Sequence, residues 1–141
     1  MAVQKSYIIA ILVTFLIAGT PAFSLSSLDR VLSSDPKIVN ALGTEIDYLT
    51  IGNQYQITAK VSNAQDFEQD FVIIIQIKDP QNAVASISWV GGSLFPNQQL
   101  SSAVSWTPNS SGQYKVQIFV WDNLKNADAL SPILEFSVVV N

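Results

Sequence analysis

Cysteine and histidine are both missing from this chain of 141 residues, and its single methionine is Met1. Without them the protein has no disulfide bond, no Ser-His-Asp or Cys-His catalytic group, and no His or Cys ligand for zinc, copper or iron. Charged residues make up only 13% of the sequence, and no Asp or Glu stands in a recognised catalytic motif. We therefore expect a protein that is not an enzyme.

Basic residues are also scarce, and the formal net charge is −4. No cluster of Lys or Arg interrupts this acidic balance, which argues against binding to nucleic acid or to an anionic membrane surface. The expected partner is therefore another protein or a second copy of the chain.

The N-terminal segment has the layout of a secretory signal peptide. Lys5 precedes an apolar run at Tyr7–Ala18, and small residues with a proline follow at positions 19–24. We expect cleavage after Ala22, with cleavage after Ser24 as the alternative. The predicted product is a secreted protein, extracellular or associated with the cell envelope.

Two other interpretations of this segment stay open. The Tyr7–Ala18 run is shorter than the ~20 residues that a spanning helix needs, yet it could remain as an uncleaved anchor. It could also follow a pilin-type leader cut between Lys5 and Ser6 and be kept as an assembly helix. Pro21 disfavours that interpretation, because proline would break the helix.

From Lys37 onward, apolar and polar residues alternate with a period of two, which indicates β-strands separated by Gly, Pro and Asn turns. This spacing predicts an all-β antiparallel sandwich of seven to eight strands at 37–141, after the signal peptide at 1–22 and a Ser-rich lead-in at 23–36. The expected strands are 37–42, 46–50, 54–62, 71–78, 84–90, 99–106, 113–121 and 133–140.

The alternation also assigns each strand an inward face, and the two sets of inward residues form one core that needs no cofactor to fold. The expected inward residues are Tyr55, Ile57, Ala59 and Val61; Phe71, Ile73, Ile75 and Ile77; Ala85, Ile87 and Trp89; Leu100, Val104 and Trp106; Tyr114, Val116, Ile118 and Val120; and Leu134, Phe136, Val138 and Val140.

Three segments carry a family resemblance: Gly52–Ile57, Ser105–Pro108 and Gly112–Val116. The chain resembles the immunoglobulin-like and fibronectin-III-like modules of secreted archaeal and bacterial surface proteins. In such modules a Tyr near the start of strand F, here Tyr114, ties down the corner between strands E and F. The resemblance implies a cell-surface role and places the B–C, D–E and F–G loops at one end. It does not extend to antibody domains, whose two Cys residues are missing.

The outward positions of strands C and F predict an apolar patch. Because the two strands run antiparallel, the apolar half of C lies beside the apolar half of F, and the start of strand G lies at the same level. A patch of this kind on a small domain marks a partner surface. The alternative is that the 25–32 segment or the F–G loop (Leu124, Ala127, Leu130) covers it. The expected patch is Val72, Ile74, Phe119, Trp121 and Ile133.

Acidic side chains gather in the B–C and F–G loops, which the resemblance places at the same end. Calcium takes six to eight oxygen ligands from such groups, so these loops are a candidate calcium site. The alternative is that they are ordinary solvated loop charges. The candidate ligands are Asp66, Glu68, Asp70, Asp122 and Asp128.

Two further loops carry candidate sites. Asn109-Ser110-Ser111 is a sequon for N-glycosylation on the predicted E–F turn. After a predicted turn at Gly91-Gly92, Leu94 and Phe95 could project outward like the wedge of an inhibitor. The alternative is a simple connection in which Phe95 caps the core.

Together these patterns predict a secreted, non-catalytic binding or structural module that acts at the cell surface through an apolar outer-sheet patch and adjacent loops. One alternative is a loop-based inhibitor of a secreted protease, acting through Leu94 and Phe95. Another is a filament subunit that retains the Tyr7–Ala18 helix.

Overall fold

The computed structural model describes residues 25–141. The predicted signal peptide, its cleavage site and the Tyr7–Ala18 helix lie outside the described residues. Within them, no helix has the length and apolar content needed to cross a membrane. The described elements are one short 3-10 helix, η1 (Ser27–Asp29), and the strands β1 (Val31–Val39), β2 (Tyr48–Leu49), β3 (Tyr55–Asn63), β4 (Gln69–Lys78), β5 (Val84–Leu94), β6 (Gln99–Trp106), β7 (Gly112–Trp121) and β8 (Leu134–Val140).

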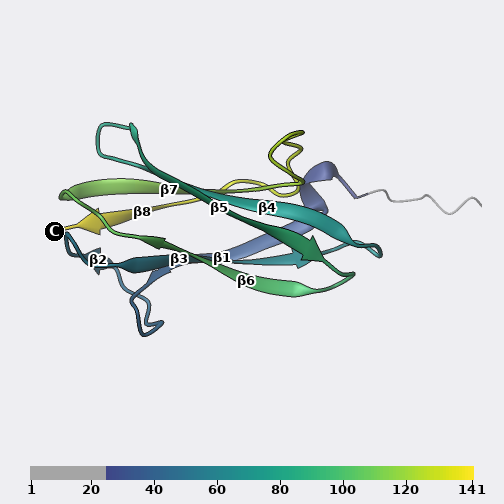
Figure 1. Cartoon of the computed structure of the whole chain (residues 1–141), viewed down its shortest axis with the longest axis horizontal. Coiled ribbons are helices and arrows are strands. Elements are labelled where there is room, and N and C mark those ends of the chain that lie inside the picture. Colours follow the sequence, from purple (N-terminus) through teal and green to yellow (C-terminus); the bar gives the residue numbers. More distant parts are fainter. Residues whose placement is uncertain (1–24) are drawn as a thin grey trace, which may run out of the picture.

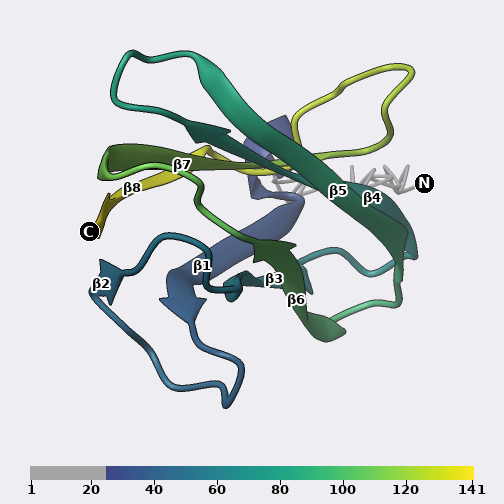
Figure 2. The same ribbon diagram turned by 60° about the vertical axis from the view of Figure 1, so that its left-hand side comes forward.

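The strands form two facing sheets (Figures 1 and 2). One has the order β1-β3-β6 and the other the order β2-β8-β7-β4-β5. All pairings are antiparallel except that of β2 with β8, which is parallel. Strands far apart in the sequence are thus neighbours, as in immunoglobulin-like modules. The prediction of an all-β, immunoglobulin-like sandwich is confirmed.

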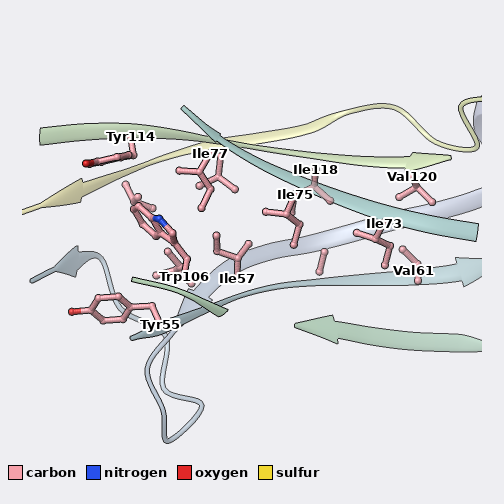
Figure 3. Close-up of a cluster of buried hydrophobic side chains, with 14 of the residues drawn as sticks. Tyr55, Ile57, Val61, Ile73, Ile75, Ile77, Trp106, Tyr114, Ile118 and Val120 are labelled. Carbon is pink, nitrogen blue, oxygen red and sulfur yellow. The ribbon is translucent and has the colours of Figure 1, made fainter. Parts of the chain in front are cut away.

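A single core fills the space between the sheets. Inward residues of β3 and β6 face those of β4 and β7 across it (Figure 3). Along β3, burial alternates residue by residue from Tyr55 to Asn63, which is the signature of a strand with one face on the core. Full burial of a large apolar side chain contributes on the order of 1.5–3 kcal/mol, so these strands hold the sheets together.

The corner between β6 and β7 is tied down by Tyr114, as the resemblance implies. This side chain is 1% exposed, and its hydroxyl lies 3.0 Å from the Ser110 carbonyl oxygen, to which it donates a hydrogen bond. Its ring meets Trp106 edge-on, with ring centroids 5.1 Å apart (Figure 3). One side chain therefore joins the turn, the end of β6 and the core.

Gly112 opens β7 in a conformation that side chains rarely adopt, with φ 134°. A Cβ atom at this position would lie 2.5 Å from Cγ of Pro80, in the β4–β5 turn. Glycine therefore allows the β4–β5 turn and the β6–β7 corner to pack closely at one end of the sandwich.

The first strand begins at Val31, not at Lys37 as predicted, so part of the expected lead-in belongs to the sheet. Its pairing with β3 shifts register between Ser34 and Lys37, where Asp35 has a φ of 50°. This irregularity precedes Pro36 and breaks the two-residue period, which hides the beginning of the strand in the sequence.

The predicted orientation of the 84–90 strand is wrong. Ile87 pairs with Gln76 and Trp89 with Ile74, so both point away from the core, where they are 54% and 60% exposed. The strand also continues through Gly91 and Gly92 to Leu94, where a turn was expected. The predicted two-residue alternation along β5 is correct, but its inward and outward faces are exchanged. The sequence could not assign the faces, because both faces of an edge strand can be exposed.

Asn63 organises the end of the sandwich at which three connections meet. It is 1% exposed, and its Nδ2 donates hydrogen bonds to the carbonyl oxygens of Phe67 at 2.7 Å and Leu94 at 3.0 Å. Its Oδ1 accepts a bond of 3.0 Å from the backbone N–H of Gln65. One buried amide thus fixes the β3–β4 loop against the end of β5.

We expect Tyr114→Phe to lower the free energy of unfolding by about 1–2 kcal/mol, because it removes the corner hydrogen bond and leaves a carbonyl unpaired. Urea denaturation measures the change. Tyr48→Phe is the matched control, since Tyr48 is 72% exposed, and should shift stability by less than about 0.5 kcal/mol. Equal effects of the two substitutions would contradict a stabilising role for the corner.

Gly112→Ala should cost about 2 kcal/mol or more, because it adds a clash with Pro80 to an unfavourable backbone angle. Gly43→Ala is the control: Gly43 also has a positive φ, of 79°, but nothing lies within 4 Å of its added Cβ. That substitution should cost only about 1 kcal/mol, the conformational part alone. The same denaturation measurement compares them, and an equal loss would mean that the Pro80 contact does not matter.

Candidate functional site

The outer face of the five-stranded sheet carries an apolar row across three strands. Ile74 of β4 pairs with Trp89 of β5 on one side and with Phe119 of β7 on the other. In the next row, Val72 pairs with Trp121. The predicted register of strands C and F is therefore the observed one. We call the following six residues the outer-sheet patch: Val72, Ile74, Ile87, Trp89, Phe119 and Trp121.

Exposure within the outer-sheet patch is uneven. Val72 and Ile74 are each 5% exposed. Trp89 and Phe119 flank Ile74 on its two sides, whereas Val72 lies between Trp121 and Gly91. Phe119 and Trp121 are half-buried, and their ring centroids lie 6.0 Å apart. Solvent therefore meets the patch mainly at β5, where Trp89 is the most exposed member. The sequence predicted this strand but assigned Ile87 and Trp89 to the core, because Ser86 and Ser88 fit either face equally well.

Ile133, the fifth residue of the predicted patch, is 55% exposed and directly precedes β8. The β7–β8 pairing begins at Leu134, opposite Ile118, and the bridge between Trp121 and Ala129 has a different register, so Ile133 has no paired residue on β7. Pairing thus brings four of the five predicted residues to one face, although Val72 and Ile74 are covered by their neighbours.

The alternative that the chain covers its own patch finds no support in the described leucines. Leu130 of the β7–β8 loop is buried in the core, while Leu124 of the same loop is 53% exposed. Leu25 and Leu28 are 49% and 41% exposed. Figure 1 shows the 79–83 turn and the 122–133 loop standing above the outer side of the sheet, near its two ends.

A polar network occupies the other half of the same face. Gln76 Nε2 donates to Gln117 Oε1 at 2.9 Å, and Gln117 Nε2 donates to Glu135 Oε2 at 2.7 Å. Lys115 Nζ lies 3.1 Å from Glu135 Oε1. The hydrogen bond from Gln117, followed by that from Lys115, holds the pKa of the Glu135 carboxyl below its ordinary value of 4.5. The patch is therefore bordered by an ordered polar row.

Nearly the whole chain matches a known protein family. The model of the S-layer A-like family matches residues 3–135. The chain belongs to the S-layer A-like family. This membership identifies the S-layer A-like chain as a structural module of the cell surface and confirms the predicted surface location at that level. Secretion, the archaeal or bacterial source and binding through the outer-sheet patch stay predictions. No curated protein sequence matches the chain significantly.

Solved structures share the fold of this S-layer A-like chain at low sequence identity. The C-terminal domain of Wzt matches with a TM-score of 0.64 and 17% identity, over 79% of this chain and 74% of that one. The CARDB domain of a Pyrococcus furiosus protein, in complex with di-metal ions, matches with a TM-score of 0.55 and 17% identity, over 84% and 95%. The Pseudomonas fluorescens glycosylase AlkC matches with a TM-score of 0.57 and 10% identity over 79% of this chain but only 30% of its own. These likenesses show the fold alone.

The structure brings only some of the five candidate calcium ligands together. Glu68, Asp70 and Asp122 line one shallow hollow between the β3–β4 and β7–β8 loops, whereas Asp66 and Asp128 do not line it. Among residues 25–141, no group of three or more acidic side chains is arranged to hold a metal ion. The Asp122 carboxylate accepts bonds within its own loop, from the backbone N–H groups of Asn123 at 2.6 Å and Asp128 at 3.0 Å.

The candidate residues of the two further loops, Leu94, Phe95 and Asn109, lie in different environments. Leu94 is 1% exposed in the core, so the predicted outward projection of Leu94 is wrong and a two-residue wedge does not form. Phe95 is 64% exposed and does not cap the core as the alternative expected. The sequon residue Asn109 is exposed on the β6–β7 turn, next to the anchored Ser110. Its glycosylation stays a prediction.

The lowered pKa of Glu135 gives a pH-dependent prediction. A depressed folded-state pKa stabilises the protein above the unfolded-state value of about 4.5, and the effect is lost as the pH falls through the folded-state value. Glu135→Gln should therefore be less stable than the wild type at pH 7, and the difference should shrink below about pH 4.5. Urea denaturation across pH tests this. Asp66→Asn is the control, since Asp66 makes no described ion pair or side-chain hydrogen bond. A difference that does not change with pH would exclude the charged network as its cause.

Proposed function

We propose that this chain is a non-catalytic structural module of the cell surface that binds a protein partner through the outer-sheet patch. The observation that carries the proposal is the 60% exposure of Trp89 on the face of a regular sheet. Covering a large exposed indole with a partner removes apolar surface from water and so lowers the free energy of the bound state. Trp is also enriched among the residues that dominate interfaces.

The geometry around Trp89 suits binding by preformed surfaces. Its strand pairs with β4 over ten residue pairs, and Phe119 lies two strands away on the same face. A sheet holds such side chains in place before binding, so association orders few additional groups. The cost of conformational entropy on binding is therefore small compared with that of a mobile loop.

The surroundings indicate what the partner surface looks like. The apolar rows adjoin the network of Gln76, Gln117, Glu135 and Lys115, whose members already satisfy one another. An apolar centre beside an ordered polar rim is the ordinary composition of a protein interface. The partner therefore presents an apolar surface with polar groups at its margin, and no strong charge is needed.

A non-catalytic role agrees with the use of the acidic groups. Asp122 accepts hydrogen bonds from its own loop, and Glu135 and Asp35 are paired with Lys115 and Lys60 at 3.1 Å and 2.7 Å. Lys60 lowers the pKa of the Asp35 carboxyl by hydrogen bonding and by its charge. These carboxylates stabilise charge pairs and loop geometry and are poorly placed for proton transfer.

The test is retention at the cell surface. In cells producing the wild-type protein we expect it in the envelope fraction, and we expect Trp89→Lys to be released into the medium, because a charge at the centre of an apolar contact must be desolvated. Immunoblotting of both fractions measures this. Ala103→Lys, on the exposed outer face of β6, is the matched control and should be retained like the wild type.

A variant released because it unfolds would be uninformative, so urea denaturation accompanies the assay. Trp89→Lys should unfold within about 0.5 kcal/mol of the wild type, as expected for an exposed site. Retention of a stable Trp89→Lys variant in the envelope fraction at the wild-type level would refute binding through the outer-sheet patch.

A further inference from the structure

β5 has one paired edge and one free edge. It spans 11 residues and pairs with β4, and no other strand pairs with it in the described part of the chain. Because backbone groups alternate sides along a strand, about half of its N–H and C=O groups point toward the free edge. Such an edge is a template for another strand.

Other strand edges in residues 25–141 are protected or offer little to bury. β1 contains Pro36 and a register shift, and β2 is only two residues long. β6 is a free edge, but its outward residues are small or polar, such as Ser101 and Ala103. β5 has one register shift, at Ala85 near its beginning, but its pairing is regular from Ser86 to Leu94. It contains no proline, no Lys and no acidic residue, which are the usual guards of an exposed edge.

The side chains of β5 are complementary to a second copy of themselves. In an antiparallel, two-fold pairing centred on Ser88, Ile87 of one copy lies opposite Trp89 of the other, and Ser86 lies opposite Val90. Directly opposed residues share a face of the sheet, so Ile87 and Trp89 cover each other twice. A centre on Ile87 would instead place Trp89 opposite Ala85 and cover less apolar surface.

The absence of charge on β5 allows the same occupant. Two copies of an acidic chain, each with a net charge of −4, repel one another. They approach best where neither carries charge, and the 84–94 strand is an uncharged segment ending the sheet. A strongly basic or acidic partner finds no counter-charge on this strand.

We propose that β5 pairs with β5 of a second copy in this register, joining two five-stranded sheets into one continuous sheet. The inference rests on the proposed function, because it names the partner that covers Trp89. It adds a direction of approach, along the sheet edge. Figure 2 shows the tip of the β4–β5 hairpin standing clear of the three-stranded sheet.

The absence of cysteine makes the register testable with introduced thiols. In the proposed pairing two copies of Ser88→Cys face each other at a separation close to that of a disulfide. Oxidation of the purified full chain should then give a disulfide dimer about tenfold faster than for Ser101→Cys on the β6 edge, because pairing raises the local thiol concentration. A mixture of Ser86→Cys and Val90→Cys chains should yield the mixed dimer.

Sedimentation velocity completes the test. The wild type should form dimers that Trp89→Lys abolishes, and non-reducing gels of the thiol variants should show the register. Cross-linking of Ser88→Cys no faster than that of Ser101→Cys would overturn the edge pairing. If Phe119→Asp still abolished dimers in that case, copies would meet face to face. If the wild type stayed monomeric but Trp89→Lys were released from cells, the partner would be a different protein.

Discussion

The position of β4 between β5 and β7 is the constraint on which the core, the outer face and the free edge all depend. This strand is buried on both faces from Phe71 to Ile75, although only one face lies against the core. Its pairing sets which residues of both neighbours point outward, because a slip of one residue would exchange the two faces. Trp89 and Phe119 share the outer face for this reason alone.

On the outer face, the residues of β4 are covered, and the side chains of the flanking strands are the ones that reach solvent. Val72 and Ile74 are covered by their neighbours, so they fix the positions of the aromatic side chains and present almost no surface themselves. The flanking strands differ in turn: β7 is central and its aromatics are half-buried, whereas β5 ends the sheet and leaves Trp89 in solvent. Solvent therefore reaches the apolar side chains of this face mainly at β5, where the sheet face and the strand edge meet.

The sequence predicted most of the fold because its signals were local. A two-residue period, Gly and Pro turns and the Gly-x-Tyr corner each act over a few residues, and Tyr114 lies where the resemblance placed it. The prediction failed for β1, whose period is broken at Asp35, and for β5, whose phase was reversed. It also missed Asn63, since a buried amide that bonds to distant carbonyls looks in sequence like any loop residue.

By itself, the sequence determined the chemistry open to this protein: no thiol or imidazole, few charges, and strands that alternate between a core face and a solvent face. Only the tertiary structure decided which strand ends the sheet, which aromatic side chains remain in solvent, and which carboxylates meet. These properties depend on pairing between segments tens of residues apart. Local alternation gives the period of a strand, whereas its neighbours determine its phase and its exposure.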